Sequence, residues 1–113
     1  MKRGEVWLVN LDPTIGSEIQ KTRPAVIVSS DALRKLPMRI VVPITGWKPK
    51  FESSPWAVAI EAGGPEGLTR RSAADATQVR AVSTKRLVRR IGQVPEPALS
   101  AVAAAVAICV EFR

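Results

Sequence analysis

Short runs rich in Val, Ile and Trp recur from the start of the chain to about residue 94, and Gly, Pro, Asp and Ser separate them. Runs of this length and spacing are typical of a small β barrel or sandwich. The chain has 113 residues, of which 46% are hydrophobic, so we expect a single domain over residues 1–113. We expect six strands, at Glu5–Leu11, Ala25–Ser29, Arg39–Ile44, Trp56–Ile60, Ala74–Val82 and Val88–Val94.

The C-terminal part of the chain has the spacing of a helix. Apolar residues recur at three- and four-residue intervals, as expected for one buried face, at Leu99, Val102, Val106 and Val110. Pro97 fits a first helical position, and the pattern predicts a helix over Pro97–Glu111. A shorter helix is expected over Asp31–Leu36, with Asp31 as its cap. The predicted fold class is therefore mainly β, with a helix after the last strand.

The charged residues indicate the class of binding partner, and the absence of histidine excludes some catalytic mechanisms. Lys and Arg outnumber Asp and Glu by 17 to 10, which gives a net charge of +7. A polyanion is the natural partner, nucleic acid being the commonest, although solubility or an acidic protein partner would also explain the charge. The absence of histidine excludes a Ser-His-Asp or two-histidine mechanism. Residues 94–112 contain no Lys or Arg, so the basic charge lies almost wholly on the β part.

The single cysteine bears on the cellular compartment. Cys109 lies among apolar residues, and we expect it to be buried. One cysteine excludes an internal disulfide, which suits a reducing cytoplasm. No secretory signal is visible at the N-terminus, and the apolar segment Ala98–Val110 is shorter than the roughly 20 residues that cross a bilayer. We therefore expect a cytoplasmic protein that does not enter a membrane.

The segment Gly16–Pro24, GSEIQKTRP, places a carboxylate, an amide, hydroxyls and two cations in one connection between strands. Pro24 favours an extended backbone at Arg23 and fixes the direction in which the chain enters the next strand. A guanidinium in this place can grip a phosphate through two parallel hydrogen bonds and stabilise a pentacoordinate phosphorus. Glu18, the one carboxylate of the segment, is the candidate to accept a proton from a substrate 2′-hydroxyl or to orient it. The alternative is a structural ion pair between Glu18 and Arg23.

The longest polar connection, Gly46–Pro55, combines Trp47 and Phe51 with Lys48 and Lys50. Aromatic rings beside cations suit the stacking of unpaired bases along a phosphate backbone. The alternative is that these rings cap the barrel. Further cations extend the basic surface, at Arg70-Arg71, Lys85-Arg86 and Arg89-Arg90.

The stretch EVWLVNLDPTIGSEIQKTRPAVIVSS, followed by IVVPIT, resembles the opening of the MazF/PemK family of toxin endoribonucleases. The likeness covers nearly the whole chain, because an RGEVW start, an LDPT-x-GSE loop, a TRP step, a VVPIT strand end and a Q-x-R-x-V segment occur in family order. The resemblance implies a homodimer of small SH3-like, CcdB/PemK-type barrels, each with a C-terminal helix. It also implies cleavage of single-stranded messenger RNA without a metal or cofactor, leaving 2′,3′-cyclic phosphate and 5′-hydroxyl ends. The implied protein partner is an acidic cognate antitoxin.

The resemblance assigns two catalytic residues. The arginine of the family's RP step falls on Arg23, and the threonine or serine that ends the following strand falls on Thr45. Arg23 would stabilise the scissile phosphate, and Thr45 would donate a hydrogen bond to it. The alternative for Thr45 is that it satisfies a turn before Gly46.

The chain departs from the family pattern at two places. Ser17 stands where some members carry a histidine, so the acid-base role of that histidine has no successor here. Asp75 aligns with a family arginine and Thr77 with the family acid, so Asp75 is not assigned a catalytic role. The predicted RNA-binding residues are Ser17, Gln20, Lys21, Trp47, Gln78 and Arg80. Among these, Gln78 is expected to contact a base edge and Arg80 the RNA backbone.

Two other functions remain open. One is a CcdB-like inhibitor that binds a topoisomerase without cutting nucleic acid, and the other is a passive RNA-binding β module. A CcdB-like protein would rely on residues of the C-terminal helix, whereas this chain ends in AVAICVEFR. A passive binder would not need Arg23 and Thr45 to meet at one phosphate. The endoribonuclease is therefore the favoured prediction.

Overall fold

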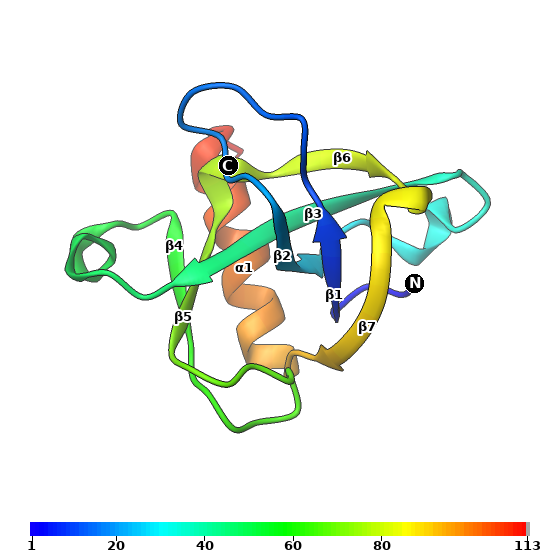
Figure 1. The fold of residues 1–113 in the computed structure, drawn as a ribbon. Coiled ribbons are helices and arrows are strands. Elements are labelled where there is room, and N and C mark those ends of the chain that lie inside the picture. The colour runs from blue at the N-terminus through cyan, green and yellow to red at the C-terminus, as the bar shows by residue number, and fades with distance from the viewer. Residues whose placement is uncertain (113) are drawn as a thin grey trace.

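The computed structural model describes residues 1–112. Within these residues seven strands form a strongly curved sheet, and one α-helix, α1 (Glu96–Cys109), packs against it (Figure 1). The strands are β1 (Glu5–Asn10), β2 (Thr22–Ile27), β3 (Met38–Gly46), β4 (Ala57–Ile60), β5 (Ser72–Asp75), β6 (Arg80–Ser83) and β7 (Leu87–Gln93). The prediction of a mainly β fold with a C-terminal helix is confirmed.

The strands pair in antiparallel fashion in the order β4-β5-β3-β2-β1-β7, and β6 pairs with β3. The two end strands, β4 and β7, do not pair with each other in the described part of the chain, so the predicted barrel is a curled but open sheet. The apolar run at the start of the predicted strand Ala25–Ser29 belongs to β2, which lies between β1 and β3.

The curled sheet buries two apolar clusters. Successive residues of a strand point to opposite faces, and in β2 Val26 belongs to one cluster while Ala25 and Ile27 belong to the other. The helix α1 closes the first cluster with Leu99 and Val102. The second cluster consists of Val9, Leu11, Ala25, Ile27, Val41, Val82 and Leu87.

Pro24 marks the end of the ladder between β2 and β3. The Val28 N–H points toward β3 and donates to the Ile40 carbonyl (2.9 Å). The Ile27 carbonyl points away from β3 and accepts a hydrogen bond from the Gly4 N–H. Because backbone groups of successive strand residues point to alternate sides, the N–H of residue 24 would point at β3. Proline has no N–H, and the paired register stops one residue earlier, at Ala25 opposite Pro43.

Pro43 has the same effect on the other side of β3. There β3 pairs with β6 as far as Val41 opposite Arg80, and with β5 from Ile44 opposite Ala74 onward. Between these two strands the chain leaves the sheet in a 3₁₀ turn, Ala76–Gln78. No ladder hydrogen bond is lost there, because Pro43 has no donor to offer. The end of β3, Thr45–Gly46, therefore pairs with β5 on one side only.

Three details differ from the sequence prediction. The run Ala74–Val82 forms two strands, because the 3₁₀ turn separates β5 from β6. The helix predicted over Asp31–Leu36 is a 3₁₀ turn at Asp31–Leu33. Its cap is Ser30, not Asp31, because the Ser30 hydroxyl accepts a hydrogen bond from the Ala32 N–H at 3.1 Å.

The C-terminal helix is shorter than predicted. It begins at Glu96, one residue before Pro97, and ends at Cys109 rather than at Glu111. Val110 lies beyond its last turn and is 64% exposed, so its predicted place on the buried face is wrong. The prediction of a buried Cys109 is also wrong, because the side chain is exposed. Partial desolvation and the nearby Asp75 carboxylate raise the pKa of this thiol, which disfavours the reactive thiolate.

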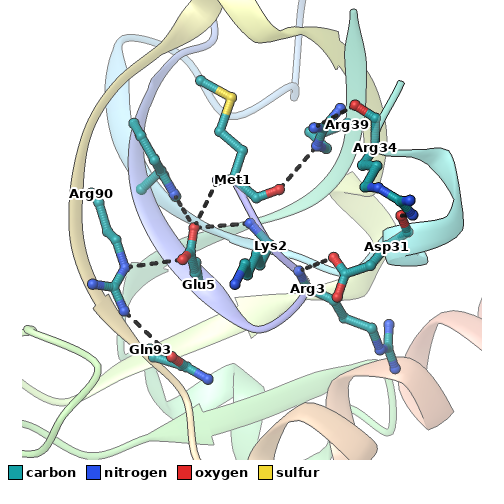
Figure 2. A network of polar contacts seen from close by, with 10 residues as sticks. Met1, Lys2, Arg3, Glu5, Asp31, Arg34, Arg39, Arg90 and Gln93 are labelled. Atoms are coloured by element: carbon teal, nitrogen blue, oxygen red, sulfur yellow. Dashed lines mark hydrogen bonds and ion pairs between the residues drawn. The ribbon is translucent and has the colours of Figure 1, made fainter. Parts of the chain in front are cut away.

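Glu5, at the start of β1, ties the N-terminus to the sheet (Figure 2). Its Oε1 accepts hydrogen bonds from the Lys2 N–H (2.9 Å) and the Trp7 indole (3.0 Å), and it pairs with the α-ammonium of Met1 at 3.2 Å. Its Oε2 pairs with Arg90 of β7 at 3.3 Å. Burial acts to raise the pKa of Glu5, but the hydrogen bonds from Trp7 and Lys2 and the α-ammonium outweigh it and lower the pKa to about 2.

We expect Glu5→Gln to destabilise the fold at neutral pH. The pKa of Glu5 is lower in the folded than in the unfolded state, so its stabilisation is present above the ordinary pKa of 4.5 and is lost as the pH falls toward 2. A shift of this size corresponds to about 3 kcal/mol at pH 7. Urea unfolding at pH 7, 4 and 2 should show a gap between wild type and variant that closes near pH 2. A gap of constant size over this range would contradict the assignment.

Candidate active site

Arg23 and Thr45 face each other where the β2–β3 ladder has ended. The register beyond Ala25 and Pro43, extended by two residues in each strand, places Arg23 opposite Thr45 on the same face of the sheet. Both line one small cavity of about 100 Å³. The strand β2 begins at Thr22, earlier than predicted, and Arg23 pairs with Val9 of β1. A strand, rather than a loop, therefore holds Arg23 in place.

One hydrogen bond orients the guanidinium of Arg23. Its Nε donates to the carbonyl oxygen of Gln20 at 3.3 Å. Within residues 1–112 its two terminal nitrogens have no acceptor, and the predicted alternative of an ion pair between Glu18 and Arg23 is not observed. The Thr45 hydroxyl likewise has no hydrogen-bond partner among these residues. Two donor groups are thus available side by side.

A second arginine, Arg70, lines the same cavity as Arg23. Arg70 precedes β5, and its guanidinium lies against Gly46, where a Cβ atom would come within 3.4 Å of Nη2. The first cavity adjoins a second one of about 350 Å³, and we call the two together the arginine pocket. Four cations and no carboxylate line the larger cavity, whose residues are Arg23, Thr45, Gly46, Trp47, Lys48, Arg70 and Arg71. Such a concentration of positive charge attracts an anion.

Trp47 forms a wall of the arginine pocket. The guanidinium of Arg71 lies 4.0 Å from the centre of the Trp47 ring, and the ring of Phe51 lies 5.8 Å away. Arg71 is held in turn by an ion pair with Glu61 at 2.9 Å. Phe51 is 6% exposed, so its ring is largely buried, which favours the alternative in which it caps the barrel.

A larger cleft of about 460 Å³ adjoins the arginine pocket, and Thr45 lines both. We call it the tryptophan cleft, because Trp56 lines it and is 40% exposed. Its other lining residues are Ser17, Ile19, Lys48, Lys50, Phe51, Ser54, Asp75, Thr77 and Gln78. A cationic pocket and a cleft with an accessible aromatic ring therefore share one residue of β3.

Gln78 holds the loop after β1 against the tryptophan cleft. Its side-chain amide donates to the Ser17 carbonyl and accepts from the Ile19 N–H, both at 3.1 Å. This pair of bonds brings Ser17 to the edge of the cleft. The amide carbonyl and one amide N–H of Gln78 are thus engaged by the loop. The base-edge contact expected of Gln78 stays a prediction.

Three of the predicted site residues lie in the same loop but outside both cavities: Glu18, Gln20 and Lys21. The Glu18 carboxylate accepts a hydrogen bond from the Ile15 N–H at 2.8 Å and so fixes a turn. Lys21 has a φ of 70°, and its N–H donates to the Asp12 carboxylate at 3.0 Å. Gln20 contributes its carbonyl to Arg23. Their observed contacts shape the loop that leads to Arg23.

Arg80 supports the base of this loop. Its Nη1 donates to the Leu11 carbonyl at 3.1 Å, and the side chain is half-buried. Arg86 adds hydrogen bonds to the carbonyls of Asn10 and Asp12. The RNA-backbone contact expected of Arg80 stays a prediction.

Residues 1–112 contain no group of three or more His, Cys, Asp or Glu side chains that could hold a metal ion. In the same residues no helix is long and apolar enough to cross a membrane. The charged groups that line the arginine pocket are guanidinium and ammonium groups.

Residues 2–110 match the family described as PemK-like, MazF-like toxin of type II toxin-antitoxin system. The chain belongs to this family. It is 41% identical over 100 residues to endoribonuclease MazF9 of Mycobacterium tuberculosis (strain ATCC 25618 / H37Rv), a match that covers 83% of the chain and 82% of MazF9. It is 36% identical over 105 residues to endoribonuclease PemK of Escherichia coli, covering 90% of the chain and 76% of PemK.

The fold is also similar to a solved mycobacterial structure, an endoribonuclease in complex with its cognate antitoxin. That match has a TM-score of 0.78 at 21% identity and covers 100% of this chain and 97% of the other. The predictions of a PemK/MazF-family toxin and of an endoribonuclease are thus confirmed.

Two residues of the site were missed from the sequence. Arg70 was expected only as part of a broad basic surface, and Trp56 only as the start of a strand. Pairing of β5 with both β3 and β4 brings the two residues to neighbouring cavities. The one signal for Trp56 was its place directly after the polar connection Gly46–Pro55, where the sequence already predicted an aromatic contact.

We expect Gln78→Leu to loosen the loop at Ser17–Ile19 without unfolding the protein. The substitution removes both hydrogen bonds of the amide and keeps a side chain of similar size. The loss of a hydrogen bond worth about 1.4 kcal/mol should speed hydrogen exchange of the Ile19 amide by roughly tenfold. The Val26 amide, deep in β2, serves as internal control. Unchanged protection of Ile19 in the variant would show that Gln78 does not hold the loop.

Proposed function

We propose that this toxin cleaves single-stranded messenger RNA without a metal ion, by attack of a substrate 2′-hydroxyl on the adjacent phosphorus. The arginine pocket carries the proposal. There Arg23, Arg70 and Thr45 converge, and no carboxylate lines the cavity to neutralise the two guanidinium groups. A phosphodiester supplies the missing negative charge and accepts hydrogen bonds from all three side chains.

Each side chain has a defined task in this reaction. The 2′-oxygen gives up its proton and forms a bond to phosphorus, the bond between phosphorus and the 5′-oxygen breaks, and the leaving 5′-oxygen takes up a proton from water, which leaves a 2′,3′-cyclic phosphate and a 5′-hydroxyl. The terminal nitrogens of Arg23 and the guanidinium of Arg70 stabilise the extra negative charge on the phosphoryl oxygens of the transition state. The Thr45 hydroxyl donates a hydrogen bond to the same phosphate. Because a guanidinium group has hydrogen-bond donors and no acceptor, neither arginine serves as the base.

Glu18 is the carboxylate that we assign to the proton of the 2′-hydroxyl. One of its oxygens holds the turn at Ile15, and the side chain is exposed on the loop that leads to Arg23. RNA that lies along this loop brings a ribose to Glu18. Ser17, at the edge of the tryptophan cleft, and Lys21, on the exposed surface, would contact the same strand. Gln20, Trp47, Gln78 and Arg80 complete the proposed RNA-binding set.

We also propose that an acidic segment of a cognate antitoxin covers the arginine pocket. The net charge of +7 and the four cations around one cavity favour an acidic partner. The similar mycobacterial endoribonuclease was solved with its cognate antitoxin. We further propose that the toxin acts as a homodimer in the cytoplasm, where messenger RNA is available.

We expect Arg23→Ala to reduce cleavage of a long single-stranded RNA in EDTA by at least about 10³-fold, and Arg70→Gln to reduce it by about 10²-fold. Glu18→Gln should lower the rate, because the amide cannot accept the proton of the 2′-hydroxyl. Sequencing of product 5′ ends, with a test for a 5′-hydroxyl, measures rate and end chemistry together.

Arg34→Ala serves as the matched control, because Arg34 is exposed and lines neither the arginine pocket nor the tryptophan cleft. It should cut RNA like the wild type. Cleavage by Arg23→Ala at the wild-type rate, in a protein with an unchanged unfolding temperature, would contradict the proposed mechanism.

A further inference from the structure

The tryptophan cleft contains a single carboxylate, that of Asp75. Asp75 ends β5, and its Oδ1 caps the following 3₁₀ turn by accepting hydrogen bonds from the N–H (3.0 Å) and the hydroxyl (2.5 Å) of Thr77. Its Oδ2 accepts no hydrogen bond from any residue in 1–112. One oxygen therefore has a structural task and the other is available to a ligand.

The sheet brings Asp75 and Trp56 to the same cleft. In the β4–β5 register Asp75 lies opposite Ala57, the residue after Trp56. The chain is fixed at this point, because the Trp56 carbonyl accepts a hydrogen bond from the Ala76 N–H at 2.9 Å. A flat ring and a hydrogen-bond acceptor therefore meet in one cleft, which is the combination that holds an unpaired nucleobase.

The same cleft lies next to the proposed site of cleavage. Thr45 pairs with Ala73 of β5, and Asp75 follows two residues later, so both side chains point to the same face of the sheet. Two residues along a strand correspond to about 7 Å. A base in the tryptophan cleft thus belongs to a nucleotide that borders the phosphate in the arginine pocket.

We propose that the tryptophan cleft binds one nucleobase beside the scissile phosphate and that Asp75 selects against uracil there. This inference rests on the proposed function, because it assigns a subsite of the same RNA. A carboxylate only accepts hydrogen bonds. Cytosine, adenine and guanine each present an exocyclic amino group to it. Uracil has a carbonyl oxygen where cytosine has its amino group, and its one donor on that edge, N3–H, lies between two carbonyl oxygens that repel the carboxylate.

Cytosine and uracil form the matched pair of ligands, because they have the same size and differ in an amino group against a carbonyl oxygen. Single-stranded hexamers of deoxycytidine and of deoxyuridine carry no 2′-hydroxyl, so their binding is measured without any cleavage. At fixed salt we expect the wild type to bind the deoxycytidine hexamer about tenfold more tightly in fluorescence anisotropy.

The informative variant is Asp75→Asn. Its carbonyl oxygen still caps the turn at Thr77, but an NH₂ donor replaces the free oxygen, so we expect the preference to fall below twofold. Trp56→Ala should weaken both hexamers by about tenfold and leave their ratio unchanged, because stacking does not distinguish the two pyrimidines. A ratio that Asp75→Asn leaves intact, with the unfolding temperature preserved, would overturn the inference.

Cleavage of a random-sequence RNA pool separates this inference from the proposed function. We expect wild-type cut sites to lack uracil at one position next to the break, and the Asp75→Asn protein to accept it there. If the wild type cuts no RNA in EDTA, the proposed function fails while the hexamer ratio still reports on the cleft. If it cuts with no such depletion in uracil, the proposed function stands and the role of Asp75 is wrong.

Discussion

The ladder between β2 and β3 lacks one backbone donor, the N–H that Pro24 does not have, and the position of the site follows from that gap. Beyond Pro24 the two strands no longer pair, and Arg23 and Thr45, which would face each other in a continued ladder, line a cavity instead. β1 still pairs with Arg23, and β5 still pairs with Thr45. Each side chain is thus held by one strand neighbour and open on the other side.

The same arrangement gathers positive charge that the protein leaves without acidic partners. Arg23, Lys48, Arg70 and Arg71 surround one cavity, and of these four residues only Arg71 forms an ion pair with a residue in 1–112. Repulsion among these cations works against folding, and the two apolar clusters, the first of which includes residues of α1, must outweigh it. Local conflicts of this kind occur where a protein binds a ligand of opposite charge. A bound phosphate removes the conflict.

The sequence predicted what depends on local pattern and left out what depends on strand pairing. Short apolar runs separated by Gly, Pro, Asp and Ser indicated the strands, and the loop before Pro24 pointed to Arg23. Arg70 and Trp56 carry no local signal of function, because they meet the site only through the register of β5 with β3 and β4. Cys109 and Val110 were misplaced because helical spacing continues past the point where α1 ends. The family resemblance supplied Thr45, which spacing alone would not distinguish from a turn residue.

The central claim is that one phosphate lies between Arg23, Thr45 and Arg70. A crystal structure of the protein with a short RNA whose riboses are all 2′-O-methylated tests it most directly, because that RNA binds without being cut. We expect one phosphate within 2.7–3.2 Å of an Arg23 terminal nitrogen and of the Thr45 hydroxyl, a normal hydrogen-bond distance, with Arg70 on the same phosphate. RNA bound along another surface, with no phosphate in the arginine pocket, would contradict the account.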